Sequence, residues 1–196
     1  MQRLIFAMAV VLGACASSDP AADYARFESA MHVRTDPDGA RVASSAPANE
    51  AKNLNLYSGG EALAMWVMVH NPPQGETRVV LAGSRARAIP HEDVKPTDPE
   101  GPGVRAEPAY VGNPWQPVDF AYTERSTECY GASFWCNRLQ QFELTLSGET
   151  VRAFIAEDAP ESIPIALFTR RDVDWRIQRA ELLATLEAAG AADQFR

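Results

Sequence analysis

The side chains of this sequence that could hold a metal ion or move protons gather in one short segment. His91, Glu92 and Asp93 follow one another, and imidazole and carboxylate groups serve both as metal ligands and as general acids or bases. Neighbouring side chains of an extended segment point in different directions, so a metal site here would have to recruit ligands from elsewhere, for example His70. We therefore expect a solvated acidic loop without a resident metal or cofactor, with a metal site at His91 as the alternative.

Residue types for covalent catalysis are present, but they form no recognised motif. The chain contains three histidines, His32, His70 and His91, and no serine lies in a G-x-S-x-G elbow. Motifs of zinc proteases, P-loops, dinucleotide-binding turns and EF-hands are also absent from the sequence. A non-enzymatic role is therefore the first interpretation. The alternative is a hydrolase or metal-dependent enzyme, which would require His70 and His91 to converge with an acid in one pocket.

Residues 1–14 have the features of a signal peptide. An arginine lies near the start and nine apolar residues follow, a run too short to span a bilayer as a helix. The small residues Gly13 and Ala14 then precede Cys15. This segment resembles the lipobox of bacterial lipoproteins, and the resemblance covers residues 1–15.

The resemblance implies that the precursor is cleaved before Cys15 and that this cysteine carries fatty acyl chains. Two or three acyl chains form a stable membrane anchor, whereas one chain binds only marginally. Residues 15–22 would then be a lipidated tether, and residues 23–196 a single folded domain. Ala16 stands where lipoproteins of the inner membrane often carry aspartate. The resemblance therefore favours the outer membrane of a Gram-negative bacterium, with the domain facing the periplasm.

The composition indicates one ordinary acidic domain. The 196 residues carry 18 basic and 26 acidic side chains, a formal net charge of −8. A chain of this length is expected to bury one core, and an acidic surface does not favour nucleic acid as a partner. Besides the membrane, we therefore expect envelope proteins or glycans as partners.

Cys129 and Cys136 are expected to form a disulfide across a short loop. An oxidising periplasm allows such a bond, and the lipid would use the third cysteine, Cys15. The spacing of the pair is longer than that of a C-x-x-C metal or redox motif. We therefore predict a structural bond.

Aromatic residues in and near this loop are the candidate binding residues of the sequence: Tyr130, Phe134, Trp135 and, outside the loop, Trp115. Aromatic groups on a rigid loop anchor a partner at low entropic cost if they point outward. The alternative is that the rings turn inward and complete the core. The sequence leaves both orientations open.

Apolar patterns predict a series of short strands. The strands are expected at residues 54–56, 62–69, 78–82, 85–89, 118–122, 142–146, 151–156 and 163–167. Residues 62–69 are apolar on both sides, which predicts a central strand covered on both faces. Residues 36–39 are expected to form a tight turn between two strands, and residues 142–156 a hairpin that turns at Ser147.

Two helices and one long loop complete the predicted elements. A short helix is expected after Pro20, and a helix with two apolar stripes at residues 172–189. Its alanine-rich stripe, which includes Ala180 and Ala184, is expected at the surface, with contact to a partner as the alternative. Residues 90–117 contain seven of the 14 prolines, so we expect a long surface loop without regular structure.

These elements predict a mainly β fold. We expect a sandwich-like antiparallel domain of seven or eight strands closed by a C-terminal helix, with an α+β sheet as the alternative. For function we expect a lipid-anchored envelope protein that docks a partner protein or glycan. The alternatives are a periplasmic enzyme near His70 and His91, or a carrier of a small apolar ligand with a cavity between sheet and helix.

Overall fold

Nine strands form one antiparallel sheet in the order β1-β2-β3-β4-β7-β6-β5-β8-β9. The computed structural model describes residues 20–45, 61–94, 109–129, 134–167 and 170–196. The strands are β1 (His32–Thr35), β2 (Arg41–Ser44), β3 (Glu61–Asn71), β4 (Arg78–Pro90), β5 (Ala109–Val111), β6 (Gln116–Cys129), β7 (Trp135–Leu146), β8 (Ser162–Leu167) and β9 (Arg170–Gln178). The helices are α1 (Pro20–Ala30), α2 (Gly148–Ile155) and α3 (Arg179–Ala188), with the 3₁₀ turns η2 (His91–Asp93) and η3 (Ala192–Gln194).

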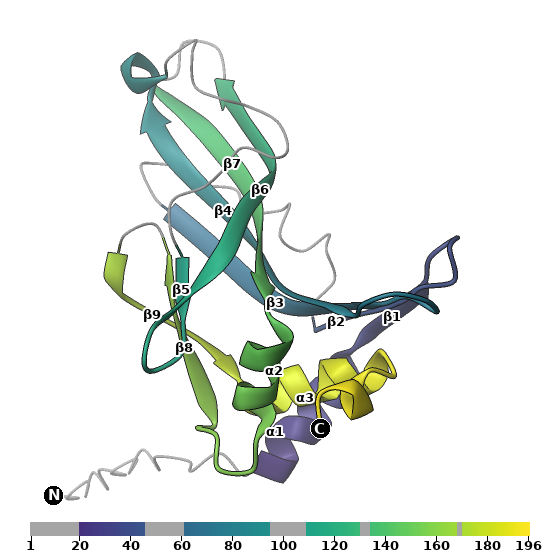
Figure 1. Cartoon of the computed structure of the whole chain (residues 1–196). Coiled ribbons are helices and arrows are strands. Elements are labelled where there is room, and N and C mark those ends of the chain that lie inside the picture. Colours follow the sequence, from purple (N-terminus) through teal and green to yellow (C-terminus); the bar gives the residue numbers. More distant parts are fainter. Residues whose placement is uncertain (1–19, 46–60, 95–108, 130–133, 168–169) are drawn as a thin grey trace, which may run out of the picture.

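The predicted fold class, a mainly β antiparallel domain with a C-terminal helix, is confirmed. Figure 1 shows the sheet curling from β1 and β2, through the long strands β3, β4, β7 and β6, to β5, β8 and β9. The sandwich-like arrangement is therefore built from one bent sheet. The helices α1, α2 and α3 gather at one end of the molecule, at the bottom of Figure 1.

The hydrophobic core lies between the curled sheet and the helices. Its largest fully buried side chains come from four strands and one helix: Val67, Val69, Val79, Leu81, Phe142, Leu144, Ile163, Ile165, Leu167, Leu182 and Leu186. The predicted central strand is β3, which lies between β2 and β4. Only one of its faces is fully covered, because Trp66 and Met68 on the other face are half-buried.

The predicted turn at residues 36–39 is confirmed as the connection between β1 and β2. The backbone N–H of Gly39 donates to the carbonyl of Asp36 at 2.9 Å. Gly39 has a φ of 84°, a backbone conformation that side chains with a Cβ rarely adopt. The strands of this hairpin follow the register that the turn sets, with Thr35 opposite Arg41.

The two short strands expected at residues 78–82 and 85–89 are one continuous strand, β4. Gly83 was expected to interrupt it, but it lies in the strand directly opposite Phe142. A Cβ on Gly83 would lie 2.4 Å from Cζ of that ring. The glycine therefore provides the space in which Phe142 packs, rather than a turn.

The expected return strand at residues 151–156 is wrong, because these residues lie mostly in helix α2. The hydroxyl of Ser147 accepts a hydrogen bond from the backbone N–H of Thr150 at 3.1 Å, which is an N-terminal helix cap. Val151, Phe154 and Ile155 are buried on one face. Their spacing of three and four residues fits a helix, and the cap at Ser147 favours the helix over a strand.

The expected helix at residues 172–189 is wrong over its first half, which is strand β9, and confirmed over its second half, which is α3. β9 pairs with β8, with Ile163 opposite Ile177 and Ile165 opposite Trp175. Apolar residues alternate with polar ones from Val173 to Ile177, which is the period of a strand. β8 is consequently not the last strand.

The alanine-rich side of α3 is covered by α1 of the same chain. Tyr24 of α1 donates a hydrogen bond to Glu187, and this bond is the main reason that the pKa of Tyr24 is raised to about 12. The hydroxyl of Thr185 contacts the sulfur of Met31 at 3.6 Å. Ala184 lies between these two contacts on the helix surface and is buried. The expectation that this side faces solvent is wrong, because α1 supplies the partner.

The expected loop at residues 90–117 contains regular structure in its described parts. η2 begins at His91, and β5 pairs with both β6 and β8. The remaining part, residues 95–108, lies outside the described residues, as does the strand expected at 54–56. The signal peptide and Cys15 lie outside them too.

Candidate binding site at the disulfide end

The disulfide joins the tips of two neighbouring strands. Cys129 ends β6 and lies directly opposite Cys136 near the start of β7. Their sulfur atoms are 2.00 Å apart, the distance of a disulfide bond, which agrees with the predicted pairing. We call this region, with residues 90–92, 129 and 134–136, the disulfide end.

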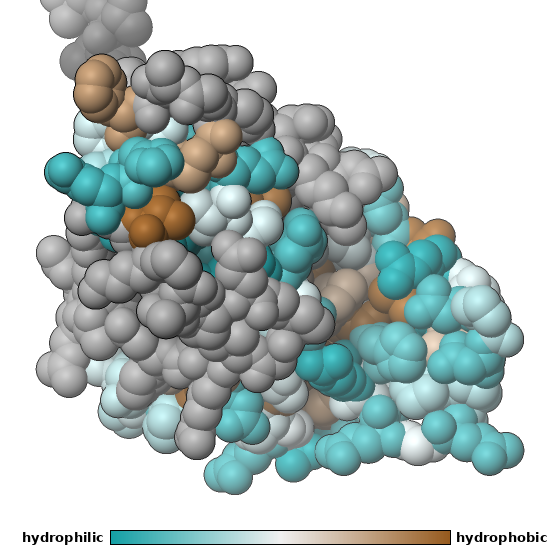
Figure 2. Space-filling model, turned by 90° about the horizontal axis from the view of Figure 1, so that it is seen from above, coloured by the Kyte–Doolittle hydropathy of each residue, from teal (hydrophilic) through white to brown (hydrophobic). Residues whose placement is uncertain are grey.

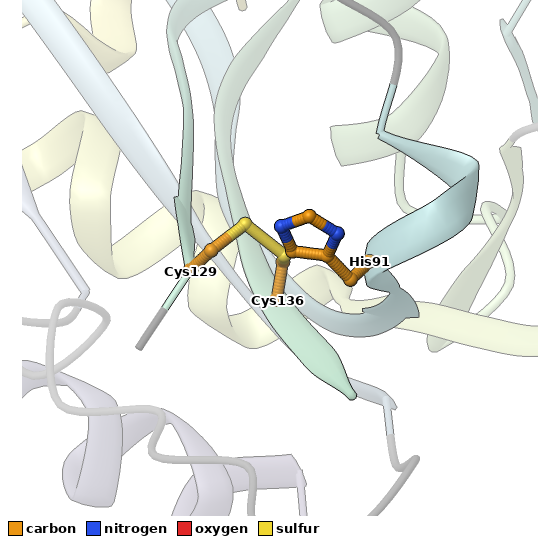
Figure 3. Close-up of side chains that lie close together, drawn as sticks. All are labelled: His91, Cys129 and Cys136. Carbon is orange, nitrogen blue, oxygen red and sulfur yellow. A yellow bond between two sulfur atoms is a disulfide. The ribbon is translucent and has the colours of Figure 1, made fainter. Parts of the chain in front are cut away.

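The end of β4 brings His91 beside this bond. β4 pairs with β7 along its whole length, with Pro90 opposite Trp135. The backbone N–H of His91 then donates to the carbonyl of Phe134 at 2.9 Å, which continues the ladder by one bond. Figure 3 shows the imidazole next to the two sulfur atoms.

Among the described residues, the structure brings together one cluster of potential metal ligands, which consists of His91 and the two cysteines. The ligand atoms of His91, Cys129 and Cys136 lie within 4.8 Å of one another. Soft metal ions bind cysteine as the thiolate, and sulfur atoms joined in a disulfide are not thiolates. In the disulfide form the cluster is therefore no metal centre. Glu92, which the sequence offered as a ligand, is exposed and lies outside this group.

The aromatic side chains of the disulfide end point outward. Phe134 is 86% exposed and Trp135 is 44% exposed. Together with Pro90, His91 and Glu92 they line a surface hollow of about 450 Å³. Figure 2 views the molecule from this end, and hydrophobic side chains lie among hydrophilic ones there. Of the two orientations that the sequence left open, the outward one is therefore observed for both residues, whereas Tyr130 lies outside the described residues.

The lining of the hollow combines apolar faces with hydrogen-bonding groups. Phe134, Trp135 and Pro90 offer flat apolar surfaces, the carboxylate of Glu92 accepts hydrogen bonds, and the ring nitrogens of His91 donate and accept them. Such a lining suits a ligand with both an apolar face and hydroxyl groups. The disulfide and the His91 backbone bond fix the lining before a ligand arrives, which lowers the entropic cost of binding.

Trp115 belongs to a different part of the molecule. It is 45% exposed, as the binding prediction requires, but it directly precedes β6, whereas Cys129 ends that strand. β6 has 14 residues, so about 40 Å of strand separates Trp115 from the disulfide end. The candidate binding residues of the sequence therefore do not form one site.

The two histidines of the enzymatic alternative are also far apart. His70 lies opposite Arg78 at the start of β4, whereas His91 follows the end of that strand. The 13 residues of β4 lie between them. The single pocket that the enzymatic alternative requires is not formed by these residues.

Sequence reasoning missed the part that His91 and Pro90 take in the site. Their place depends on the register between β4 and β7, which joins segments more than 40 residues apart in sequence. One local signal was available, because residues 85–89 alternate between basic and apolar side chains directly before Pro90, which predicts a strand that ends there.

No described helix is long and apolar enough to cross a membrane. No protein-family model matches the chain, and no curated protein or solved structure matches it either.

Proposed function

We propose that this protein is a lipid-anchored envelope protein that binds a glycan, without chemical turnover, in the hollow at its disulfide end. The observation that carries the proposal is the outward orientation of Phe134 and Trp135 on a covalently closed tip. Burying a large aromatic side chain normally stabilises a fold by about 1.5–3 kcal/mol, and Phe134 makes almost none of that contribution. A ligand that covers the ring supplies the missing burial.

A glycan fits this hollow better than a protein surface does. A standard protein interface uses about 20–30 residues on each side, whereas five described residues line the hollow. A sugar ring has an apolar face of C–H groups that stacks on aromatic rings, and hydroxyl groups that bond to a carboxylate or an imidazole. Trp135 and Phe134 offer the stacking faces, and Glu92 and His91 the bonding groups.

The membrane anchor is the second part of the proposal, and the signal-peptide resemblance supports it. Acyl chains on Cys15 would hold the domain at the outer membrane, facing the periplasm. Metabolic labelling with a fatty acid tests this part: Cys15→Ser is expected to remove the label and leave the precursor uncleaved. Normal labelling of this variant would contradict the anchor and leave the glycan site untouched.

Titration of the purified protein with envelope oligosaccharides tests the glycan site. The probes are glycan fragments of peptidoglycan and core oligosaccharides of lipopolysaccharide. Trp135→Ala is expected to weaken binding about tenfold or more, because stacking and burial of the indole are lost together. Trp115→Ala is the matched control, since its indole has the same exposure at the other end of β6. Equal loss in both variants, or no binding of any probe to the unaltered protein, would contradict the proposal.

A further inference from the structure

A second cavity lies at the helical end, which comprises α1, α2, α3 and residues 190–196. Its volume is about 570 Å³, within the range of small-molecule sites. Its lining comes from the second half of α2, the segment after it, α3 and the segment after η3: Arg152, Ile155, Ala156, Glu157, Arg179, Leu183, Phe195 and Arg196. It is separate from the disulfide end, because no residue lines both cavities.

One wall of this cavity is apolar. Ile155 and Phe195 belong to the core, and Leu183 packs against the core while remaining half-buried. These side chains already lie in the folded structure whether or not a ligand is present. They therefore offer a preformed surface for an alkyl chain.

The other wall is cationic, in a chain whose formal net charge is −8. Three of the lining residues are arginines and one is a glutamate. Arg196 pairs with Glu187 at 2.8 Å and with Asp193 at 3.4 Å, so its charge is balanced. Arg152 and Arg179 remain, and Glu157 is the one acidic side chain of the lining, so basic side chains outnumber acidic ones in this wall.

The two remaining arginines have donors that the described residues do not use. Arg179 donates from one Nη to the carbonyl of Ile155 at 3.0 Å, but its buried Nε has no hydrogen-bond partner. The guanidinium of Arg152 forms no ion pair within the described residues. The buried Nε of Arg179 is closed to a ligand, but the planar fork of a guanidinium group that lines the cavity matches a carboxylate.

We propose that this cavity binds an amphiphilic monoanion, with an acidic head group on Arg152 and Arg179 and an alkyl chain against Ile155, Leu183 and Phe195. Charge and apolar surface lie side by side here, so neither a neutral hydrocarbon nor a small inorganic anion uses the whole cavity. A carboxylate on an alkyl chain, such as that of a medium-chain fatty acid, matches a guanidinium fork beside an apolar wall. This proposal uses observations at the helical end only and is independent of the glycan site.

Calorimetric titration with decanoate, decanol and inorganic phosphate tests the proposal on the folded protein. Decanoate is expected to bind at least about tenfold more tightly than either decanol or phosphate, because only decanoate contacts both walls. Equal binding of decanoate and decanol, binding of phosphate as tight as that of decanoate, or no binding of decanoate would overturn it.

Arginine variants then locate the head group. Arg152→Met and Arg179→Met keep a long apolar side chain, and each is expected to weaken decanoate about tenfold while leaving decanol unchanged. Arg41→Met is the matched control, since Arg41 is exposed on β2 and lies outside the cavity. Arg152 is exposed, so its variant keeps the test valid even if Arg179→Met fails to fold. Unchanged decanoate binding in Arg152→Met, or an equal loss in Arg41→Met, would contradict the proposed head-group site.

Discussion

The disulfide end and the helical end of this molecule are held together by different forces. At the helical end, Leu182 and Leu186 of α3 pack into a core cluster that includes residues of strands β2 to β9. At the disulfide end, the main core cluster of β4 and β7 reaches only to Leu81 and Phe142, although Ile89 and Cys136 beyond it are also buried. The tip is fixed in addition by the strand ladder and by the bond between Cys129 and Cys136.

This difference explains why two neighbouring aromatic side chains, Phe134 and Trp135, can lie exposed together at the disulfide end. A tip that depends on hydrophobic burial would turn Phe134 and Trp135 inward, because burial would be its main source of stability. The covalent bond stabilises the tip without the burial of these two rings, which remain available to a ligand. The helical end keeps its apolar side chains in the core and exposes charged groups around its cavity.

The largest expected effect is a difference in stability between a variant at the helical end and a variant at the disulfide end. Leu186→Ala removes a fully buried side chain and is expected to lower the free energy of unfolding by about 2–5 kcal/mol. Phe134→Ala removes a larger side chain that is 86% exposed, and we expect a change below about 0.5 kcal/mol. Urea denaturation of both variants measures the contrast. A similar loss in both would show that the tip is part of the core.

Removing the disulfide is expected to affect one end alone. The Cys129→Ala and Cys136→Ala double variant should lose about 2.5 kcal/mol, the chain-entropy value for so short a loop. Glycan binding should weaken with it, because Phe134 and Trp135 lose their fixed positions, whereas decanoate binding should persist. Parallel titrations of the folded double variant check this. If decanoate binding were lost and glycan binding retained, the assignment of forces to the two ends would be reversed.

A substitution in the middle of the long strands is expected to have a smaller effect on stability. Gly83→Ala is expected to cost about 1–3 kcal/mol, since the new Cβ would overlap the ring of Phe142. Gly148→Ala is its control, because the nearest atom to a Cβ there lies 3.7 Å away and the residue begins α2. Thermal unfolding distinguishes the two. Equal stability of both variants would mean that Phe142 does not pack on Gly83.

The smallest expected effect is a pH dependence at the helical end. Burial raises the pKa of Glu181 above its usual 4.5, while the hydrogen bond from Ser45 opposes this shift. The folded state therefore binds the proton on Glu181 more tightly than the unfolded state does. The resulting contribution to the free energy of unfolding is complete below about pH 4.5 and is lost as pH rises through the raised pKa.

Glu181→Gln provides the measurement. The free energy of unfolding of the unaltered protein, minus that of the variant, is expected to fall as pH rises from about 4.5 toward neutrality. Denaturation at a series of pH values checks the sign. A difference that rises with pH would contradict the burial of this carboxyl group.

The sequence predicted the fold class and the disulfide because both have local signals. Alternation at Phe142, Leu144 and Leu146 predicts β7, and the spacing of Cys129 and Cys136 suits a short covalent loop. These signals can be recognised without knowing which distant segments of the chain pair as strands.

The errors in the predicted elements also have physical causes. The apolar spacing of residues 172–189 predicts one helix, but Val173 and Ile177 also fit a strand, and pairing with β8 decided the outcome. For α2 the reverse holds, since Val151 and Phe154 were read as a strand although Ser147 caps a helix.

The candidate site could be predicted only in part. Phe134 and Trp135 were identified from their place in a closed loop, whereas their orientation and the contribution of His91 depend on the register of β4 against β7. The cavity at the helical end depends on how α2 packs against α3. Neither arrangement leaves a pattern in a single segment.

The central claim is that a glycan binds at Trp135 and not at the equally exposed Trp115. The four tryptophan indole N–H signals of the protein can be followed by two-dimensional NMR during titration with the envelope oligosaccharides, after assignment through Trp→Phe variants. We expect the Trp135 signal to shift in a saturable manner while the Trp115 signal stays in place. A saturable shift at Trp115 alone, or no shift at Trp135 with any probe, would contradict the account.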